Sequence, residues 1–224
     1  MSTALVCSSH SPLLYCYDKP PQEWDAIQAA FQTSRDFVEA FNPELVFIFG
    51  TDHFNGFFLN TMPAFCVGLA ANAAADIGGF TGAIDVPENT AMQAIEYLRA
   101  NGLDPAVSYQ MTIDHGFSQT LQLMTGGLDA VPTIPIFINC ITRPFVPFER
   151  TILLGNKLGK FAKSLNKRVL FLASGGMSHH PTRYYPAFGE GVVEVMAWQL
   201  SGGKDPQSMS SEQWLERLDS MHHE

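Results

Sequence analysis

The sequence predicts an α/β protein: a single three-layer domain over residues 1–224, with a mostly parallel central sheet covered by helices. Two apolar runs, 45–49 and 169–173, are rich in β-branched and aromatic residues, as are strands buried on both faces of a parallel sheet. Between such runs lie longer segments whose apolar residues recur every three or four positions, which indicates helices. Polar residues follow each run at once. Because ligands bind beyond the carboxyl ends of the strands in such sheets, we expect the active site there.

The order of the elements follows from these patterns and from the residues that interrupt them. We expect strands at residues 4–7, 44–50, 65–70, 107–109, 131–139 and 169–173. We expect helices at residues 22–41, 88–99, 116–124, 148–165, 189–200 and 211–218. The alanine- and glycine-rich segment 70–84 predicts irregular structure. Two prolines in strand 131–139 predict that it lies at the edge of the sheet or begins late, because proline cannot donate a sheet hydrogen bond.

Composition limits the classes of partner. Of the 224 residues, 46% are hydrophobic and 16% are charged, so the chain can bury a sizeable core. The formal net charge is −9, which argues against nucleic acid or an anionic membrane as partner, since both favour a basic face. The four cysteines form no CxxC pair, the amino terminus lacks a signal-peptide pattern, and no apolar run has the length of a membrane span. We therefore expect a cytoplasmic protein.

Histidines gather where the expected strands end. Five of the seven follow strands 4–7, 44–50, 107–109 and 169–173: His10, His53, His115, His179 and His180. A single histidine at such a position is often structural; His10 could be a turn residue, and His53 could be anchored by Asp52. Four strand ends that converge on one rim favour a functional group instead. Imidazole binds first-row transition metals and also transfers protons near neutral pH, so the pattern indicates a metal site with acid/base chemistry.

Several motifs from residue 9 to residue 180 carry a resemblance to a known family. They are Ser9-His10-Ser11-Pro12, Asp52-His53-Phe54-Asn55-Gly56, Asp114-His115-Gly116-Phe117, Gly126-Gly127-Leu128-Asp129, Pro135-Ile136-Phe137-Ile138-Asn139 and Ser174-Gly175-Gly176-Met177-Ser178-His179. On these residues the chain resembles the class III (type II) extradiol catechol dioxygenases, the family of the protocatechuate 4,5-dioxygenase β subunit. The resemblance is strongest to members that act on a catechol with a three-carbon acid side chain, 2,3-dihydroxyphenylpropionate or 2,3-dihydroxycinnamate.

The resemblance implies a role for each matched histidine. His10 and His53 match the two histidine ligands of Fe(II), and His115 and His179 match the acid/base pair that moves protons during ring cleavage by O₂. The implied product is a hydroxy-oxo-dienedioate. Asp114, next to His115 in sequence, could orient or charge an imidazole ring, although sequence neighbours often point apart.

The third iron ligand of the family is a glutamate well downstream of the second catalytic histidine. The chain ends at Glu224, before that region, and we do not assign Glu224 as a ligand. We therefore expect a single catalytic domain, 1–224, that lacks its C-terminal part, with the third ligand beyond residue 224.

Two other classes of function stay open at this point. A histidine-rich α/β site could hold zinc and activate water, as in a metal-dependent hydrolase. A chain without its third ligand could also be a non-catalytic subunit of the same fold. For the dioxygenase, a cation should meet the substrate carboxylate, and Arg143 and Arg183 are the candidates. The family also suggests a homo-oligomer.

Overall fold

A computed structural model describes residues 2–11, 22–175 and 186–222 of the chain. The chain divides into two compact units. The larger unit comprises Met1–Gly56 and Pro63–Gly176, and the smaller one comprises Phe57–Met62 and Met177–Glu224. The larger unit contains both sheets and the three histidines described below.

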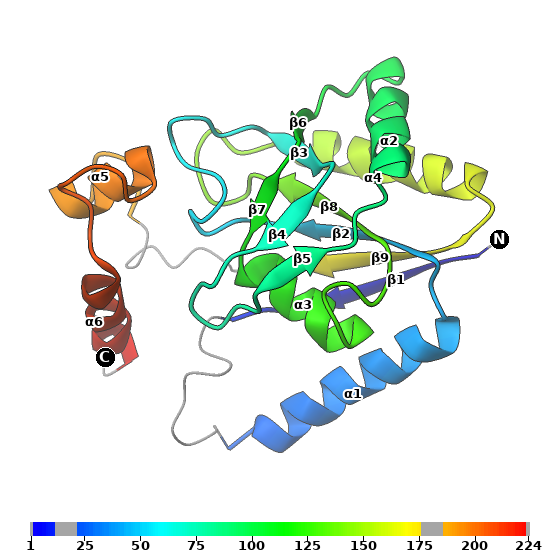
Figure 1. The fold of residues 1–224 in the computed structure, drawn as a ribbon, viewed down its shortest axis with the longest axis horizontal. Coiled ribbons are helices and arrows are strands. Elements are labelled where there is room, and N and C mark those ends of the chain that lie inside the picture. The colour runs from blue at the N-terminus through cyan, green and yellow to red at the C-terminus, as the bar shows by residue number, and fades with distance from the viewer. Residues whose placement is uncertain (1, 12–21, 176–185, 223–224) are drawn as a thin grey trace. The chain divides into compact units, whose positions relative to one another are not determined.

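The larger unit is built on a six-stranded sheet with the order β1-β9-β2-β8-β3-β6 (Figure 1). Its strands are β1 (Ser2–Ser8), β9 (Arg168–Ser174), β2 (Leu45–Gly50), β8 (Thr133–Ile138), β3 (Phe65–Gly68) and β6 (Ala106–Ser108). All neighbouring pairs are parallel except β8 and β3, which are antiparallel. The predicted mostly parallel sheet is therefore confirmed, and the carboxyl ends of β1, β9, β2 and β8 share one edge.

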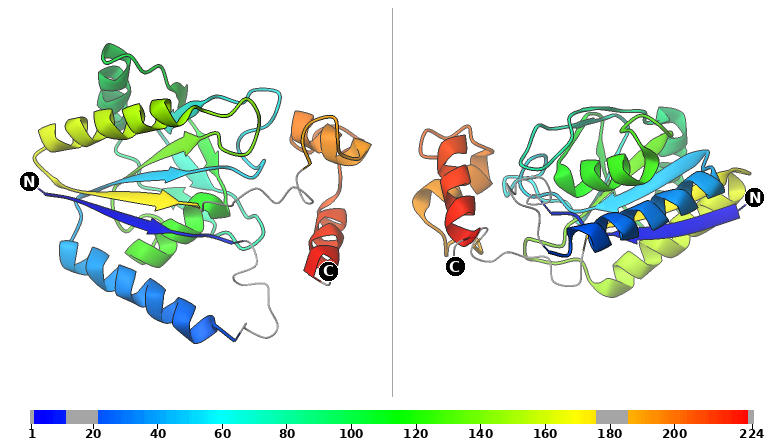
Figure 2. Two further views of the ribbon diagram at one scale, coloured as in Figure 1. Left: turned by 180° about the vertical axis from the view of Figure 1, so that it is seen from behind. Right: turned by 90° about the horizontal axis from the view of Figure 1, so that it is seen from below.

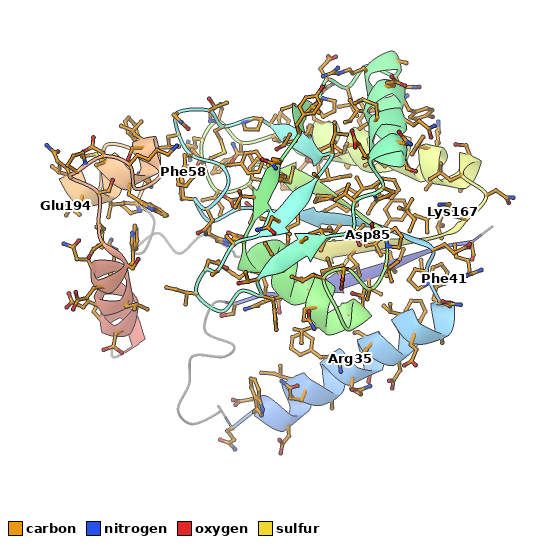
Figure 3. The ribbon with its side chains drawn as sticks, viewed as in Figure 1. Arg35, Phe41, Phe58, Asp85, Lys167 and Glu194 are labelled. Atoms are coloured by element: carbon orange, nitrogen blue, oxygen red, sulfur yellow. The ribbon has the colours of Figure 1, made fainter. Side chains whose placement is uncertain are left out.

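Helices cover both faces of this sheet, which gives the three predicted layers. Helices α2 (Glu88–Ala100) and α4 (Phe148–Ser164) pack on each other and on one face, whereas α3 (His115–Thr125) packs against β9 and β2 on the other. Helix α1 (Trp24–Phe41) packs on α3, and the views in Figure 2 show α1 and α4 on opposite sides of the sheet. Arg35 of α1 donates from Nε to the carbonyl oxygen of Leu123 in α3 at 2.9 Å (Figure 3).

A hydrophobic core lies between the sheet and the α2–α4 layer. Phe47 of β2 is fully buried there and contacts the ring of Phe161 from α4, with ring centroids 6.4 Å apart. Leu154 and Leu158 of α4 are also buried, as the periodicity of residues 148–165 predicts. Buried apolar area of this kind fixes the sheet and hence the positions of the loops at its edge.

Of the two alternatives predicted for residues 131–139, a late start and an edge position, the strand β8 shows the first and not the second. It begins late, at Thr133, but it lies between β2 and β3 and is not an edge strand. The register explains how Pro135 is accommodated: pairing with β3 reaches only from Ile138 to Ile136. Pro135 therefore lies beyond the ladder on that side, where the missing N–H breaks no hydrogen bond with β3.

A second, smaller sheet was not predicted from the sequence. It has the order β5-β4-β7, formed by Gly82–Ile84, Ala71–Ala73 and Met111–Ile113. Two of its strands lie within the segment 70–84, for which the sequence predicts irregular structure. The third, β7, follows β6 after a short turn, so that β7 and not the strand at 107–109 leads into His115. The site is thus built by two sheets.

The smaller unit contains the helices α5 (Val193–Ser201) and α6 (Ser211–His222), which confirms both predicted helices. The indole rings of Trp198 and Trp214 lie 4.4 Å apart between centroids, and Trp198 meets the ring of Phe58 edge-on at 5.9 Å. The N–H of Leu59 donates to the carbonyl oxygen of Gln199 at 2.8 Å, which ties the short segment 57–62 to α5. Among the described residues, no helix is both long enough and apolar enough to cross a bilayer.

Candidate active site

Three of the predicted histidines lie together at the carboxyl edge of the large sheet. The ring centroids of His10 and His53 are 5.1 Å apart, those of His10 and His115 are 5.4 Å apart, and those of His53 and His115 are 4.3 Å apart. Each ring offers one nitrogen, and these nitrogens all lie within 4.8 Å of one another. All three side chains are buried. Three imidazoles in this arrangement are suited to hold a metal ion or to exchange protons with a bound molecule.

His10 follows β1 and is oriented by residues of β9 and α3. Its Nδ1 forms a 2.6 Å hydrogen bond with Oγ of Ser174, at the end of β9. The same oxygen bonds Oγ1 of Thr120 in α3 at 2.8 Å. Gln119 of α3 accepts from the N–H of Ser11 at 3.0 Å and donates to its carbonyl oxygen at 2.7 Å. Adjacent strand ends and α3 thus fix both the ring and the backbone at His10.

His53 is held by Asp114, which lies between β7 of the small sheet and the start of α3. Oδ2 of Asp114 accepts from the backbone N–H of His53 at 2.6 Å and from its ring Nδ1 at 2.9 Å. Oδ1 of the same carboxylate accepts from the N–H of Gly116 at 2.8 Å and caps the start of α3. A Cβ on Gly116 would lie 2.8 Å from the carbonyl oxygen of Thr51, so only glycine lets α3 begin this close to the loop after β2.

His115, the first residue of α3, is held by a different carboxylate, Asp76. Oδ2 of Asp76 accepts from the backbone N–H of His115 at 3.1 Å and also bonds its ring Nδ1. The side chains of both residues are more than 90% buried. Nε2 of His115 is buried and has no hydrogen-bond partner among the described residues. The ring therefore presents one unpaired nitrogen on the side away from Asp76.

The two carboxylates change the proton affinities of the site. Burial raises the pKa of Asp114. The charge of His53, the hydrogen bonds from the His53 ring and backbone, and the charge of His115 lower it by more. The pKa of Asp114 therefore lies well below its usual range. Asp114 is therefore an ionised acceptor, and Nδ1 of His53 carries the proton. Burial lowers the pKa of His115, but the hydrogen bond that its ring donates to Asp76 and the negative charges of Asp114 and Asp76 outweigh this effect, so the net shift of the pKa is upward.

The structure settles the positions of only some predicted residues. It brings His10, His53 and His115 together as expected, whereas His179 lies outside the described residues. The ring nitrogen Nδ1 of His53 is bonded by Asp114, and Asp52 accepts from the N–H groups of Asn55 at 3.0 Å and Gly56 at 2.9 Å, which shapes the loop after β2.

Asp114 and Asp76 are the carboxylates of the site. Asp114 orients a ring, as its sequence position suggests, but the ring is that of His53, 61 positions away. The same carboxylate caps the start of α3. Asp76 was missed. It lies in a loop of the small sheet, 39 positions before His115, and nothing in its sequence neighbourhood marks it.

Comparison with known proteins decides the family. Residues 4–219 match the family described as the catalytic LigB subunit of aromatic ring-opening dioxygenase. The chain belongs to this family. The match covers nearly the whole chain and includes all the histidines predicted as site residues.

Individual proteins are also similar to this chain in sequence. A protein named 2,3-dihydroxyphenylpropionate/2,3-dihydroxicinnamic acid 1,2-dioxygenase 2, from Pseudomonas putida, is 46% identical over 181 residues, 81% of this chain and 58% of its own length. Proteins named 2,3-dihydroxyphenylpropionate/2,3-dihydroxicinnamic acid 1,2-dioxygenase are 44% identical in Rhodococcus rhodochrous and 42% identical in Escherichia coli O139:H28. Each of these two matches covers 92% of this chain and 65% of the relative. The chain therefore spans about three fifths of the length of these relatives.

The donor set fits a transition-metal ion. His10 and His53 use Nδ1 for hydrogen bonds to Ser174 and Asp114, so Nε2 is the atom that each ring would offer to an ion. A metal-bound histidine typically donates its other N–H to a carboxylate or a similar acceptor, and the Asp114–His53 pair has this form. Imidazole nitrogen suits iron, zinc and copper alike, so the donors indicate a metal site without selecting the metal.

Proposed function

We propose that the chain is the ring-cleaving part of an Fe(II)-dependent extradiol dioxygenase. Its substrate would be a catechol with a three-carbon acid side chain, 2,3-dihydroxyphenylpropionate or 2,3-dihydroxycinnamate, which O₂ opens to a hydroxy-oxo-dienedioate. The observation that carries the proposal is the buried group of three imidazoles, in which each Nδ1 is held by Ser174, Asp114 or Asp76. The substrates in the names of relatives 42–46% identical support the choice of catechol.

In this proposal His10 and His53 hold the iron. Fe(II) with open coordination positions supplies a centre at which the two catechol oxygens and O₂ can bind side by side. The protein keeps both ligand rings fixed through Ser174 and Asp114 and excludes water from them. His179, which lies outside the described residues, is proposed as the partner of His115 in acid/base catalysis. The resemblance implies a glutamate as the third ligand, and we assign no residue of this chain to that position.

His115 is the proposed acid/base group within the described residues. With its Nδ1 bonded to Asp76, it would take up or release a proton at Nε2. Asp76 raises the proton affinity of this ring, whereas a cation held by His10 and His53 would lower it. Opposed effects of this kind keep an imidazole pKa near the working pH, where general acid/base catalysis is most effective.

Arg143 is the proposed partner of the substrate carboxylate. It lies in the loop that follows β8, whose carboxyl end is next to that of β2. Among the described residues of the larger unit, the other lysines and arginines lie on α1, α2 or α4 or at the amino end of β9, where Lys167 is labelled in Figure 3. Asn139 holds the loop by accepting from the N–H of Thr142 at 3.1 Å and donating to its carbonyl oxygen at 2.8 Å.

Replacement of this cation tests the proposed substrate class. Arg143→Gln should raise KM for 2,3-dihydroxyphenylpropionate about 10- to 100-fold, since a charge-assisted hydrogen bond contributes roughly 1.5–3 kcal/mol. KM for an uncharged 3-alkylcatechol should not change. Lys163→Gln on α4 is the matched control for loss of one positive charge. An equal rise in KM for both substrates would show that Arg143 does not recognise the substrate carboxylate.

A metal-dependent hydrolase is the second candidate, and one feature of the site favours it. Three histidine ligands with an open position form a common catalytic zinc site, and His115 could complete such a set. One experiment separates the two candidates. The protein is reconstituted anaerobically with Fe(II), 2,3-dihydroxyphenylpropionate is added, and O₂ uptake and a yellow product are followed.

The experiment should use this chain beside a version that continues to the length of its relatives. The proposal predicts Fe(II)-dependent O₂ uptake in at least the longer protein. If neither version consumes O₂ with any catechol, the dioxygenase proposal fails, and zinc-dependent hydrolysis becomes the function to test. The cytoplasmic location and the homo-oligomeric state stay predictions.

A further inference from the structure

The loop that carries Asp76 is attached to α3 at several points. This loop joins β4 to β5 in the small sheet. Gln119 of α3 donates from Nε2 to the carbonyl oxygen of Gly78 at 2.7 Å, and Oγ of Ser118 accepts from the N–H of Phe80 at 3.1 Å. His115 begins the same helix, so the loop and the ring are parts of one hydrogen-bonded assembly. The position of Asp76 relative to His115 is fixed by these bonds between α3 side chains and the loop backbone, and not by the Asp76 and His115 side chains alone.

The start of the loop is attached to β7 in the same way. The N–H of Ala74 donates to the carbonyl oxygen of Ile113 at 2.8 Å, two residues before His115. The N–H of Asp76 then donates to the carbonyl oxygen of Ala74 at 3.0 Å. The loop is therefore tied down on both sides of Asp76, to β7 before it and to α3 after it.

Gly79 leaves the space that the Asp76 carboxylate needs. A Cβ at position 79 would lie 1.9 Å from Oδ1 of Asp76 and 3.4 Å from the backbone nitrogen of His115. A side chain there would push the carboxylate off its position beside the ring. Gly79 also closes the turn by donating its N–H to the carbonyl oxygen of Asp76 at 3.2 Å. The local sequence thus accommodates one orientation of the Asp76 carboxylate.

We propose that Asp76 is the positioning residue of His115. Its Oδ2 accepts from both the backbone N–H and the ring of His115, which sets the orientation of the ring and keeps the Nδ1 position protonated. Nε2 is then the nitrogen of this ring that stays available, in a ring whose centroid lies 4.3 Å from that of His53. The role of this ring orientation in proton transfer rests on the proposed function, whereas the orientation and the tautomer of His115 do not. Asp76 is thus assigned to the ring of His115, although Asp76, Asp114 and His115 are also close enough to hold an ion together.

The first test measures which ring nitrogen of His115 carries the proton in the metal-free protein. Histidine labelled with ¹⁵N gives separate signals for protonated and unprotonated ring nitrogens, and His115→Gln identifies the His115 pair. The unaltered protein should show His115 with its proton on Nδ1, and Asp76→Asn should lose that state because an amide can donate to Nδ1. Asp85→Asn is the matched control, since Asp85 follows β5 of the same small sheet and is exposed (Figure 3). An unchanged His115 tautomer in Asp76→Asn would overturn the proposal.

The second test measures turnover in the iron-loaded protein, in the version that continues to the length of its relatives. Asp76→Asn should lower kcat at least about 100-fold with little change in KM or iron content, because the effect acts through a general acid/base. Asp76→Glu, which keeps the charge, should recover part of kcat. An unchanged kcat in Asp76→Asn, with His115→Gln impaired, would overturn the catalytic role while the proposed function stands. If Asp76→Asn does not fold, Gly79→Ala should disturb the same tautomer.

An inactive unaltered protein would instead count against the proposed function. The ¹⁵N signals would still decide whether Asp76 positions His115. Loss of metal binding in Asp76→Asn, with the His115 tautomer preserved, would identify Asp76 as a metal ligand and overturn the proposal.

Discussion

Asp114 and Asp76 hold two stacked histidine rings in the same way, but they are themselves held differently. In both pairs, one carboxylate oxygen accepts from the backbone N–H and also bonds the ring of the same histidine. The second oxygen of Asp114 caps α3 through Gly116, whereas the second oxygen of Asp76 has no hydrogen-bond partner among the described residues. Asp114 is therefore part of the framework of the helix as well as of the site. Within the described part of the chain, the hydrogen bonds of the Asp76 carboxylate go to His115 alone, which suits a residue whose task is to position that ring.

The largest expected effect is at the ring that Asp114 holds. His53→Ala should lower O₂ uptake by at least about 1,000-fold, because a bound metal contributes several kcal/mol to catalysis. The measurement is Fe(II)-dependent O₂ uptake with 2,3-dihydroxyphenylpropionate. Retention of more than a tenth of the activity would mean that His53 is not a ligand.

His115, held by Asp76, should behave differently. His115→Gln keeps a polar side chain of similar reach but removes the proton-transfer group, and kcat should fall on the order of 10²–10⁴-fold. Steady-state kinetics should show KM within about threefold of the unaltered protein. A rise in KM with kcat preserved would assign His115 to substrate binding.

Metal affinity should separate the two carboxylates. Asp114→Asn should weaken Fe(II) binding about 10- to 100-fold, as is typical when the hydrogen-bond partner of a metal-bound histidine is changed. Asp76→Asn should leave Fe(II) binding unchanged. Anaerobic titration with Fe(II) measures both, and equal losses in the two variants would remove the distinction between them.

The smallest effects should appear in the pH dependence of stability without metal. The pKa of His115 is raised on folding, so its contribution is fully present below about pH 6.5 and is lost as the pH rises through the folded-state pKa. The pKa of Asp114 is lowered, so its contribution is present above about pH 3.9 and is lost as the pH falls through the folded-state pKa. Asp76→Asn should therefore destabilise the protein most below pH 6.5, and Asp114→Asn most above pH 4, each by about 2 kcal/mol. Urea unfolding between pH 3 and pH 9 checks this, and parallel curves for the two variants would contradict it.

The large sheet and the helices could be predicted because their signals are local. The run Leu45–Gly50 and the spacing of Leu154, Leu158 and Phe161 reflect burial in one element, which periodicity records. The small sheet could not be predicted in this way. Its strands are three residues each, and Ala71–Ala73 and Gly82–Ile84 contain mostly small side chains that give no strand pattern. Its existence depends on pairing between distant segments.

The same distinction applies to the site. His10, His53 and His115 were predictable because each follows a strand, although for His115 the strand is β7 and not the one expected. Asp76 was not predictable, since its contact with His115 depends on a loop that is tied to α3 by Gln119 and Ser118. The position of Asp114 beside His115 in sequence suggests His115 as its partner, whereas the ring that Asp114 bonds is that of His53. The side chains of adjacent residues there meet different rings.

We propose that His53 binds the metal and that its stacked neighbour His115 does not. The most direct test is an anaerobic Fe(II) binding isotherm for His115→Gln and His53→Gln, each compared with the unaltered protein at the same pH. His115→Gln should bind Fe(II) with the affinity of the unaltered protein, whereas His53→Gln should lose at least about tenfold in affinity. Loss of Fe(II) binding in His115→Gln to the level of His53→Gln would show that His115 is a ligand, and would contradict the proposed division between the two rings.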